Sequence, residues 1–229
     1  MTSTYLLRVW MPDRPGALGA LASRIGAVGG DVAGIDILER GAGRVIDELV
    51  VELPGDDPAL VDLLLSEIHQ VDGVDVESIR PAAVTLRDPR LDALETAAML
   101  VGAATADDAV AELCTHAVRT VGALWGAVVD LESDALVASE GDAPSTAWLT
   151  AFVVGSQSSA RVVGSDTGPA DVVWAPLPVA GYALVMGRHG EAFRARERRQ
   201  AAALARIVDA RFRDMRIIAS RTSHPSMGC

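Results

Sequence analysis

The sequence predicts an α+β protein built from two domains. Its 229 residues exceed the usual size of one domain and suit two. Half of the residues are apolar, which is enough for a sizeable core. Short alternating apolar segments and segments of helical period follow one another, with glycine or proline at the boundaries. We place a first domain at residues 1–80, a linker at 81–90, a second domain at 91–216 and a flexible tail at 217–229.

The first domain reads as β-α-β-β-α-β. Period-2 alternation predicts strands, period-3.6 spacing predicts helices, and the turns carry Pro-Gly, Gly-Gly, Gly-Ala-Gly and Asp-Gly. The expected elements are a strand at 5–11, a helix at 17–28, strands at 32–38 and 44–53, a helix through 60–68 and a strand at 74–79. Asp57 and Pro58 suit the cap and the first turn of the second helix. This order predicts the split β-α-β arrangement, an antiparallel sheet with both helices on one face.

The second domain reads as helices enclosing an antiparallel sheet. The expected elements are helices at 91–103 and 107–121, strands at 125–131, 136–139, 171–175 and 181–187, and a long closing helix at 193–216. Residues 176–180 predict a hairpin between the last two strands. Residues 144–157 are ambiguous and could be helical. The two halves share no pattern, so the sequence shows no internal repeat.

Composition and charge exclude several function classes. All 20 Lys and Arg residues are arginine, which excludes a P-loop lysine, a Schiff-base lysine and a Ser–Lys dyad. The net charge of −11 lies in residues 1–110, which hold nineteen acids and eight arginines, whereas residues 111–229 hold twelve of each. Since phosphate repels an acidic surface, we expect no nucleic acid as the main partner.

The cysteines and the apolar segments predict a cytoplasmic protein. Cys114 and Cys229 form neither a metal-ligand spacing nor a disulfide framework, which suits a reducing compartment. The first residues lack the basic start and apolar stretch of a signal peptide. No apolar run reaches about 18 residues, so we expect no contact with a membrane.

Catalytic motifs are missing from the sequence. The histidines are scattered, and no G-x-S-x-G, H-E-x-x-H, C-x-x-C or G-x-G-x-x-G occurs. Cys114 and His116 are two positions apart on an expected helix and therefore point in different directions. We expect no catalytic residue, no metal and no cofactor, and hence no enzyme.

The turn after the first strand has the chemistry of an amino-acid site. Pro15-Gly16 reverses the chain tightly, and Gly16 lets a ligand approach the backbone. The helix that begins there presents unpaired N–H groups and the positive end of its dipole, which suit a carboxylate. Asp13 could hold an ammonium group. The alternatives are that Asp13 only caps the helix, that Gly16 serves only the turn and that Asp31 only ends the following turn.

Residues 5–80 resemble the ACT family of amino-acid-binding regulatory domains, through DRPGALGALASRIGAVGGDVAGIDI and the β-α-β-β-α-β order. The resemblance implies a ferredoxin-like fold and a site shared across a homodimer, where the first strand–helix loop of one chain meets the second strand of another. The resemblance implies the ligand-binding residues Met11, Asp13, Arg14, Pro15, Gly16, Ala17, Leu18 and Asp31. Of these, Met11, Asp13 and Asp31 fall where serine-binding members carry a histidine and two asparagines. Since an ionised aspartate only accepts hydrogen bonds, these departures argue against serine as the ligand.

Residues 91–216 resemble a GAF-like sensor domain, through the order helix, helix, strand, hairpin and exit helix. The resemblance implies that the first and last helices of the domain pack together and support dimerisation. The last helix carries eight arginines against three acids over 194–216. Such a helix could contact an acidic partner or simply form a solvated face.

These patterns predict a non-enzymatic, homodimeric regulatory protein that senses an amino acid through its first domain. One alternative is a dimerisation or interaction subunit that regulates a separate enzyme or transcription factor and binds no small molecule. A further alternative is an enzyme whose site follows no recognised motif.

Overall fold

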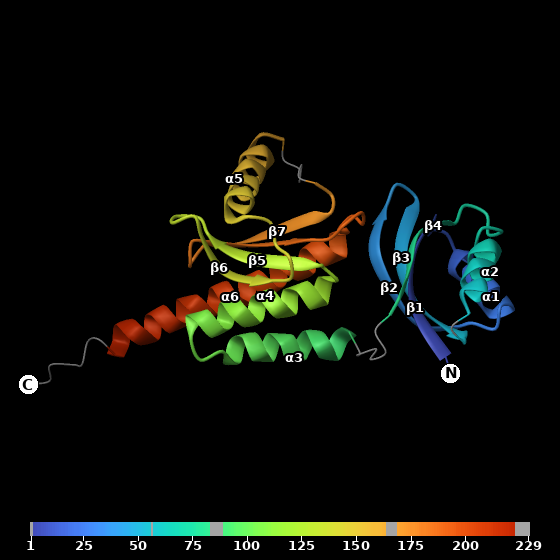
Figure 1. Cartoon of the computed structure of the whole chain (residues 1–229), viewed down its shortest axis with the longest axis horizontal. Coiled ribbons are helices and arrows are strands. Elements are labelled where there is room, and N and C mark those ends of the chain that lie inside the picture. The colour runs from blue at the N-terminus through green and yellow to red at the C-terminus, as the bar shows by residue number, and fades with distance from the viewer. Residues whose placement is uncertain (1, 56, 83–88, 164–168, 223–229) are drawn as a thin grey trace, which may run out of the picture. The chain divides into compact units, whose positions relative to one another are not determined.

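The computed structural model describes residues 2–55, 57–82, 89–163 and 169–222. The chain divides into a first unit, Met1–Arg87, and a second unit, Asp88–Cys229. Over these described residues, each unit has its own four-stranded antiparallel sheet, and the structure is α+β with six helices (Figure 1). Most of the expected linker, 83–88, and the end of the expected tail, 223–229, lie outside the described residues.

The first unit has the predicted element order. Its elements are β1 (Thr2–Pro12), α1 (Ala17–Ala27), β2 (Asp31–Gly41), β3 (Arg44–Pro54), α2 (Pro58–Ile68) and β4 (Asp75–Pro81). The strands lie in the order β2-β3-β1-β4, and every neighbouring pair is antiparallel. Asp57 caps α2 as predicted, because its side chain accepts the Ala59 N–H at 2.9 Å. This sheet is the split β-α-β arrangement, with β2 at one edge.

The core of the first unit lies between its sheet and its two helices. Alternate residues of β1 and β3 face the helices, among them Leu7, Val9 and Leu49, which are completely buried. Leu21 and Ile25 of α1 pack against them at helical spacing. Period-2 strands and a 3.6-period helix thus bury their apolar sides against each other, as the sequence pattern predicts.

The second unit surrounds its sheet with helices on both faces. Its elements are α3 (Pro89–Gly102), α4 (Ala106–Val121), β5 (Trp125–Asp130), β6 (Ala135–Glu140), α5 (Thr146–Val163), β7 (Val172–Leu177), β8 (Tyr182–Gly187) and α6 (Ala195–Thr222). The strand order is β6-β5-β8-β7, antiparallel throughout. One core joins α3, α4 and α6 to one face of the sheet, and a smaller core packs α5 on the other face. The ambiguous segment 144–157 is therefore mainly helical, within α5.

Among the boundaries that differ from the sequence pattern, two lie in the second unit. Strand β7 continues through Pro176 to Leu177, which a proline tolerates here because β7 is an edge strand. Helix α6 begins at Ala195 and continues to Thr222, so residues 217–222 are helical and not the start of a flexible tail. Ile217 and Ile218 are exposed and therefore do not continue the buried stripe of α6. The helix continues past them because the residues around them have high helix propensity.

Within the described ranges, none of the helices combines the length and the apolar character needed to span a bilayer.

Candidate functional site

The loop between β1 and α1 is held in place by backbone hydrogen bonds. The Asp13 N–H donates to the Gly43 carbonyl at 2.9 Å, which ties the loop to the β2–β3 hairpin. The Arg14 N–H donates to the Pro12 carbonyl at 2.9 Å. Gly16 then takes a left-handed conformation, with φ 88°, and precedes the first helical residue. Only glycine adopts this conformation without strain, so the backbone requires Gly16 for the turn.

The start of α1 presents backbone donors to solvent. The first helical hydrogen bond joins the Ala20 N–H to the Gly16 carbonyl at 3.0 Å. Within the described part of the chain no acceptor receives the N–H groups of Leu18 and Gly19, and no side chain caps the helix. No acidic residue occupies the first turn. These amides carry the positive end of the helix dipole, so an anionic group fits here.

The surface around Gly16 is open. A Cβ atom placed on this glycine would meet no atom within 4 Å. Asp13, Arg14 and Pro15 are exposed, and Leu18 is 37% exposed. A small molecule can therefore reach the amides and the Asp13 carboxylate from solvent.

Two of the sequence-predicted residues face the interior instead. Met11 is 2% exposed and packs in the core between the sheet and the helices. Ala17 is also buried in that core. Both side chains shape the loop from beneath, because a large residue before the turn and a small one after it let α1 pack closely on the sheet.

Asp31 lies at the opposite end of the sheet from the loop. It stands opposite Glu52 of β3, which in turn faces Thr4, whereas the loop follows Pro12 at the other end of β1. Eight residues of strand separate the two positions, about 26 Å at 3.3 Å per residue. The Asp31 carboxylate accepts the N–H of Val32 at 2.8 Å. One copy of the chain therefore does not bring Asp31 and the loop together.

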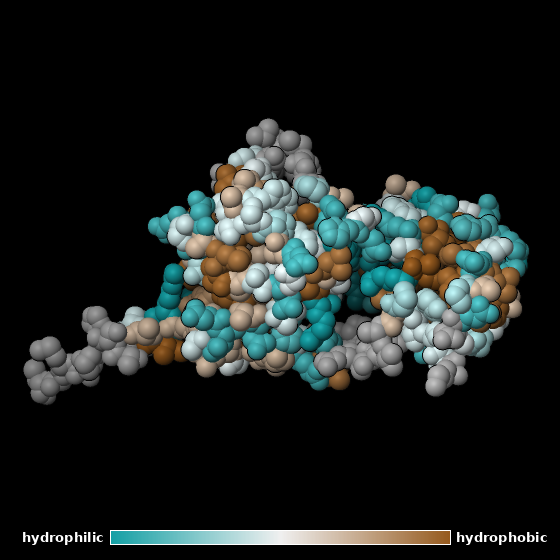
Figure 2. Space-filling view, viewed as in Figure 1, coloured by the Kyte–Doolittle hydropathy of each residue, from teal (hydrophilic) through white to brown (hydrophobic). Residues whose placement is uncertain are grey.

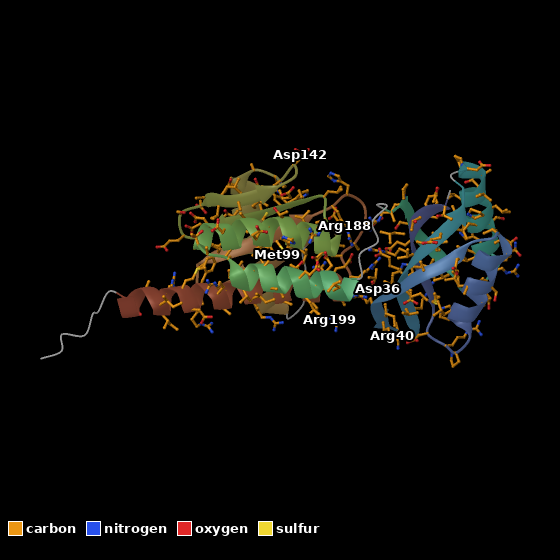
Figure 3. The ribbon with its side chains drawn as sticks, turned by 90° about the horizontal axis from the view of Figure 1, so that it is seen from below. Asp36, Arg40, Met99, Asp142, Arg188 and Arg199 are labelled. Carbon is orange, nitrogen blue, oxygen red and sulfur yellow. The ribbon has the colours of Figure 1, made fainter. Side chains whose placement is uncertain are left out.

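The structure adds Asp47 to the candidate site, a residue that the sequence analysis did not single out. It lies on β3 opposite Val9 and Ile37, on the face that the helices cover, and it is 4% exposed. Burial raises the pKa of its carboxyl, the charge of Arg40 lowers it and the charge of Asp13 raises it. Arg40 lies on β2, near the hairpin that leads into β3 (Figure 3).

A signal for Asp47 was present in the sequence. In the strand pattern of residues 44–53, Val45, Leu49 and Val51 occupy one parity and face the core. Asp47 has the same parity and is the only acid among these alternate positions from 45 to 51. A charged residue at a core position is unusual and suggests a function.

The edge of the first unit next to this site is apolar. Ile35 and Ile37 of β2 are each 42% exposed and point to the same face as the core residues of β3. In α1, Arg24 bonds Glu67 of α2 at 3.0 Å, and Leu18 lies about 120° away around the helix, toward β2. On the face that Figure 2 shows, which is not that of β2, apolar side chains also reach the surface of this unit between its sheet and its helices.

The described residues of the second unit, 89–163 and 169–222, offer no comparable group of polar side chains. Burial raises the pKa of the Cys114 thiol to about 12, and the charge of Glu140 contributes to this rise. The thiol is therefore protonated at neutral pH and does not act as a nucleophile. His116 is buried between Glu112, 3.0 Å from Nε2, and Arg119, 2.8 Å from Nδ1. Among the described residues, no three His, Cys, Asp or Glu side chains are grouped so as to hold a metal ion.

Comparison with known proteins finds only partial likeness. No protein-family model matches the sequence, and no curated protein matches it. Solved structures similar to part of the chain include the ACT domain of a GTP pyrophosphokinase from Chlorobium tepidum, with 13% identity, 36% of this chain, 100% of that chain and a TM-score of 0.28. An uncharacterized protein from Thermotoga maritima has 19% identity, the same two coverages and a TM-score of 0.28. The C-terminal domain of the MgtC protein from Mycobacterium tuberculosis has 17% identity, 38% and 92% coverage and a TM-score of 0.29.

Proposed function

We propose that this chain is a non-enzymatic regulatory protein whose first unit binds an amino acid at an interface between two copies. The observation that carries the proposal is the β1–α1 loop, where left-handed Gly16 leaves the amides of Leu18 and Gly19 open to solvent. The amides suit the carboxylate of a ligand, and the exposed carboxylate of Asp13 suits its ammonium.

The edge strand β2 supports the proposal that a second copy of the chain forms part of the site. The backbone groups on its outer side have no neighbouring strand within the first unit's sheet, and its residues Ile35 and Ile37 are exposed. Antiparallel pairing of two β2 strands about a twofold axis would continue the sheet and bury these side chains.

The same pairing would complete the site. Gly41, at the end of β2, faces Arg44, which faces Pro12, so the loop and the end of β2 share one end of the sheet. In an antiparallel pair, the beginning of one β2 lies beside the end of the other. Asp31 of the partner subunit would then lie near the loop from which Asp31 of the same chain is distant.

The second unit would receive the signal. In this proposal it is a GAF-like module, and ligand binding changes regulation only if the two states of the chain differ in affinity for the ligand. The unit provides long helices, α3 and α6, on one face of its sheet, which offer surfaces for a response.

The test is the thermal unfolding of the full chain in the presence of each of the twenty amino acids. Unfolding is monitored by calorimetry, which resolves separate unfolding transitions. A specific ligand at 100 times its dissociation constant stabilises the protein by about 2.7 kcal/mol. Gly16→Asn retains the left-handed conformation but adds a side chain over the amides, so it abolishes the shift. Gly181→Asn is the matched control, because Gly181 has φ 77° and equally open surroundings in the second unit. A shift that survives Gly16→Asn would exclude this loop.

Ile35→Lys tests the role of the second copy. A charge on the exposed side of the edge strand opposes pairing of two copies. We expect sedimentation to show a dimer for the unchanged protein and a monomer for the variant, with loss of ligand binding. Full binding by a monomeric variant would contradict a shared site.

A second function, an interaction subunit without a small ligand, is favoured by one observation. On helix α3, the side chains of Leu91, Leu94 and Val101 are 54%, 69% and 58% exposed. They are three and seven residues apart and therefore form one apolar stripe along the helix. A flat response to all twenty amino acids would favour this function.

A further inference from the structure

Asp47 is a buried carboxylate whose hydrogen-bonding capacity is not satisfied. Its neighbours on the same face of β3 are Val45 and Leu49, both core residues. Its Oδ1 atom is inaccessible to solvent and, among the described residues, has no hydrogen-bond partner. Buried polar groups in folded proteins are nearly always paired, so an unpaired carboxylate oxygen calls for a cationic or donor group that arrives from elsewhere.

The position of Asp47 relates it to the β1–α1 loop. Asp13 follows Pro12, which faces Arg44, and Asp47 lies three residues further along β3, about 10 Å at 3.3 Å per residue. Burial is the largest cause of the raised pKa of Asp47. The charge of Arg40 lowers this pKa and the charge of Asp13 raises it, so these three charges share one region of the unit.

Arg14 in the loop and Arg40 on β2 add positive charge to this region, but neither donates a hydrogen bond to the buried Asp47 Oδ1 among the described residues. The open amides of Leu18 and Gly19 attract an anion, the exposed Asp13 attracts a cation, and the buried Asp47 attracts a second cation at a greater depth. A neutral amino acid carries one carboxylate and one ammonium, and so brings no hydrogen-bond donor for the Asp47 Oδ1 atom. An amino acid with a cationic side chain carries all three complementary charges.

The overall charge of the first unit agrees with a cationic ligand. Residues 1–87 hold fourteen acids and seven arginines, which gives a net charge of −7. Such a field raises the local concentration of cations and repels anions.

We infer that the ligand of this site is an amino acid with a cationic side chain, whose side-chain ammonium or guanidinium pairs with Asp47. Its α-carboxylate binds the amides of Leu18 and Gly19, and its α-ammonium binds Asp13. The inference rests on the proposed function and adds the class of ligand to it. Asp47 is then a specificity-determining residue, because it distinguishes a charged side chain from an uncharged one of the same length.

The experiment compares lysine and arginine with norleucine, which has an uncharged side chain of similar length, by isothermal titration of the full chain. We expect the unchanged protein to bind lysine or arginine at least ten times more tightly than norleucine. Asp47→Asn keeps the shape of the side chain and removes its charge, and should reduce this preference to less than twofold. The matched control is Asp62→Asn on the exposed side of α2, which should leave the preference unchanged.

The possible results separate this inference from the proposed function. Equal binding of lysine and norleucine by the unchanged protein, or a preference that persists in Asp47→Asn, overturns the inference while amino-acid binding stands. Binding of no amino acid at all overturns both. The comparison of ligands on the unchanged protein decides the matter even if a variant does not fold.

Discussion

The buried ion pair between Arg188 and Glu197 holds the start of α6 to the end of β8. All five N–H donors of the Arg188 guanidinium are used: two bond the Glu197 carboxylate at 2.8 and 2.9 Å, and three bond carbonyls of Val121, Glu191 and Ala192 at 3.1, 3.0 and 2.7 Å. The guanidinium also lies 4.1 Å from the ring centre of Phe193. Figure 3 shows Arg188 in the second unit.

Glu197 has a second task in the same place. Its Oε2 accepts the N–H of Arg194 at 2.6 Å, just before the first residue of α6, as the acid of a capping box does. Replacement by glutamine would leave the buried guanidinium without a counter-charge and replace one charge-assisted acceptor by an amide. Breaking a buried pair from one side costs about 3–5 kcal/mol. We therefore expect Glu197→Gln to destabilise the second unit by about 3 kcal/mol or more.

The assay is thermal unfolding followed by tryptophan fluorescence, since three of the chain's 4 tryptophans, Trp125, Trp148 and Trp174, lie in the second unit. At about 2–4 °C per kcal/mol for a unit of this size, the midpoint should fall by about 10 °C. Glu112→Gln is the control, because the Glu112 side chain is 44% exposed and solvent therefore screens its pair with the buried His116. A midpoint for Glu197→Gln within 2 °C of that of the unchanged protein corresponds to a loss of less than about 1 kcal/mol. That result would refute the argument that this buried ion pair stabilises the second unit.

Three further predictions concern a cap, a thiol and a titration. Thr105 accepts the Asp108 N–H at 3.1 Å in a full capping box, so Thr105→Ala should cost about 1 kcal/mol in urea unfolding, and no change would contradict the capping role. With its pKa raised from 9.0 to about 12, Cys114 should react with iodoacetamide at pH 8 about a thousandfold more slowly than an unperturbed thiol, as peptide mass mapping can show. Because the pKa of Asp47 is raised in the folded state, the folded protein holds this proton more tightly, and the stability that it contributes is lost as the pH rises above 3.8. The free energy of unfolding of Asp47→Asn minus that of the unchanged protein should therefore increase from pH 3 to pH 7. A decrease of this difference would show instead that charges such as Arg40 stabilise the carboxylate.

Local structure in the first unit could be predicted from sequence because local forces decide it. The Pro15-Gly16 pair indicated a turn before α1, and the structure places Gly16 in the left-handed conformation that glycine alone adopts readily. Apolar residues at two- and 3.6-residue periods identified the strands and helices. Helix α5 was harder to assign, because its sequence from Thr146 to Ala160 contains no charged residue to mark the exposed side.

The candidate site was only partly predictable for a different reason. Spacing along the chain placed Asp13 and Gly16 in one loop, and they are in one loop. Spacing could not show that Asp31 lies at the other end of the sheet, since that depends on which strands pair and in which direction. Asp47 has the parity of a core residue, but only the tertiary structure shows that its carboxylate is buried and lies within reach of the charge of Asp13.

The sequence by itself determined the order of the elements, the reversal at Gly16, the capped start of α2 and the acidic character of the first unit. Each of these depends on the backbone preferences, side-chain period or charge of residues close together in the chain. The tertiary structure alone decided which carboxylates share one region, which edge of the sheet is open, and which buried carboxylate oxygen has no hydrogen-bond partner among the described residues. Those properties arise from strand pairing and packing between residues distant in sequence, where burial and proximity, and not residue type, set the chemistry of a side chain.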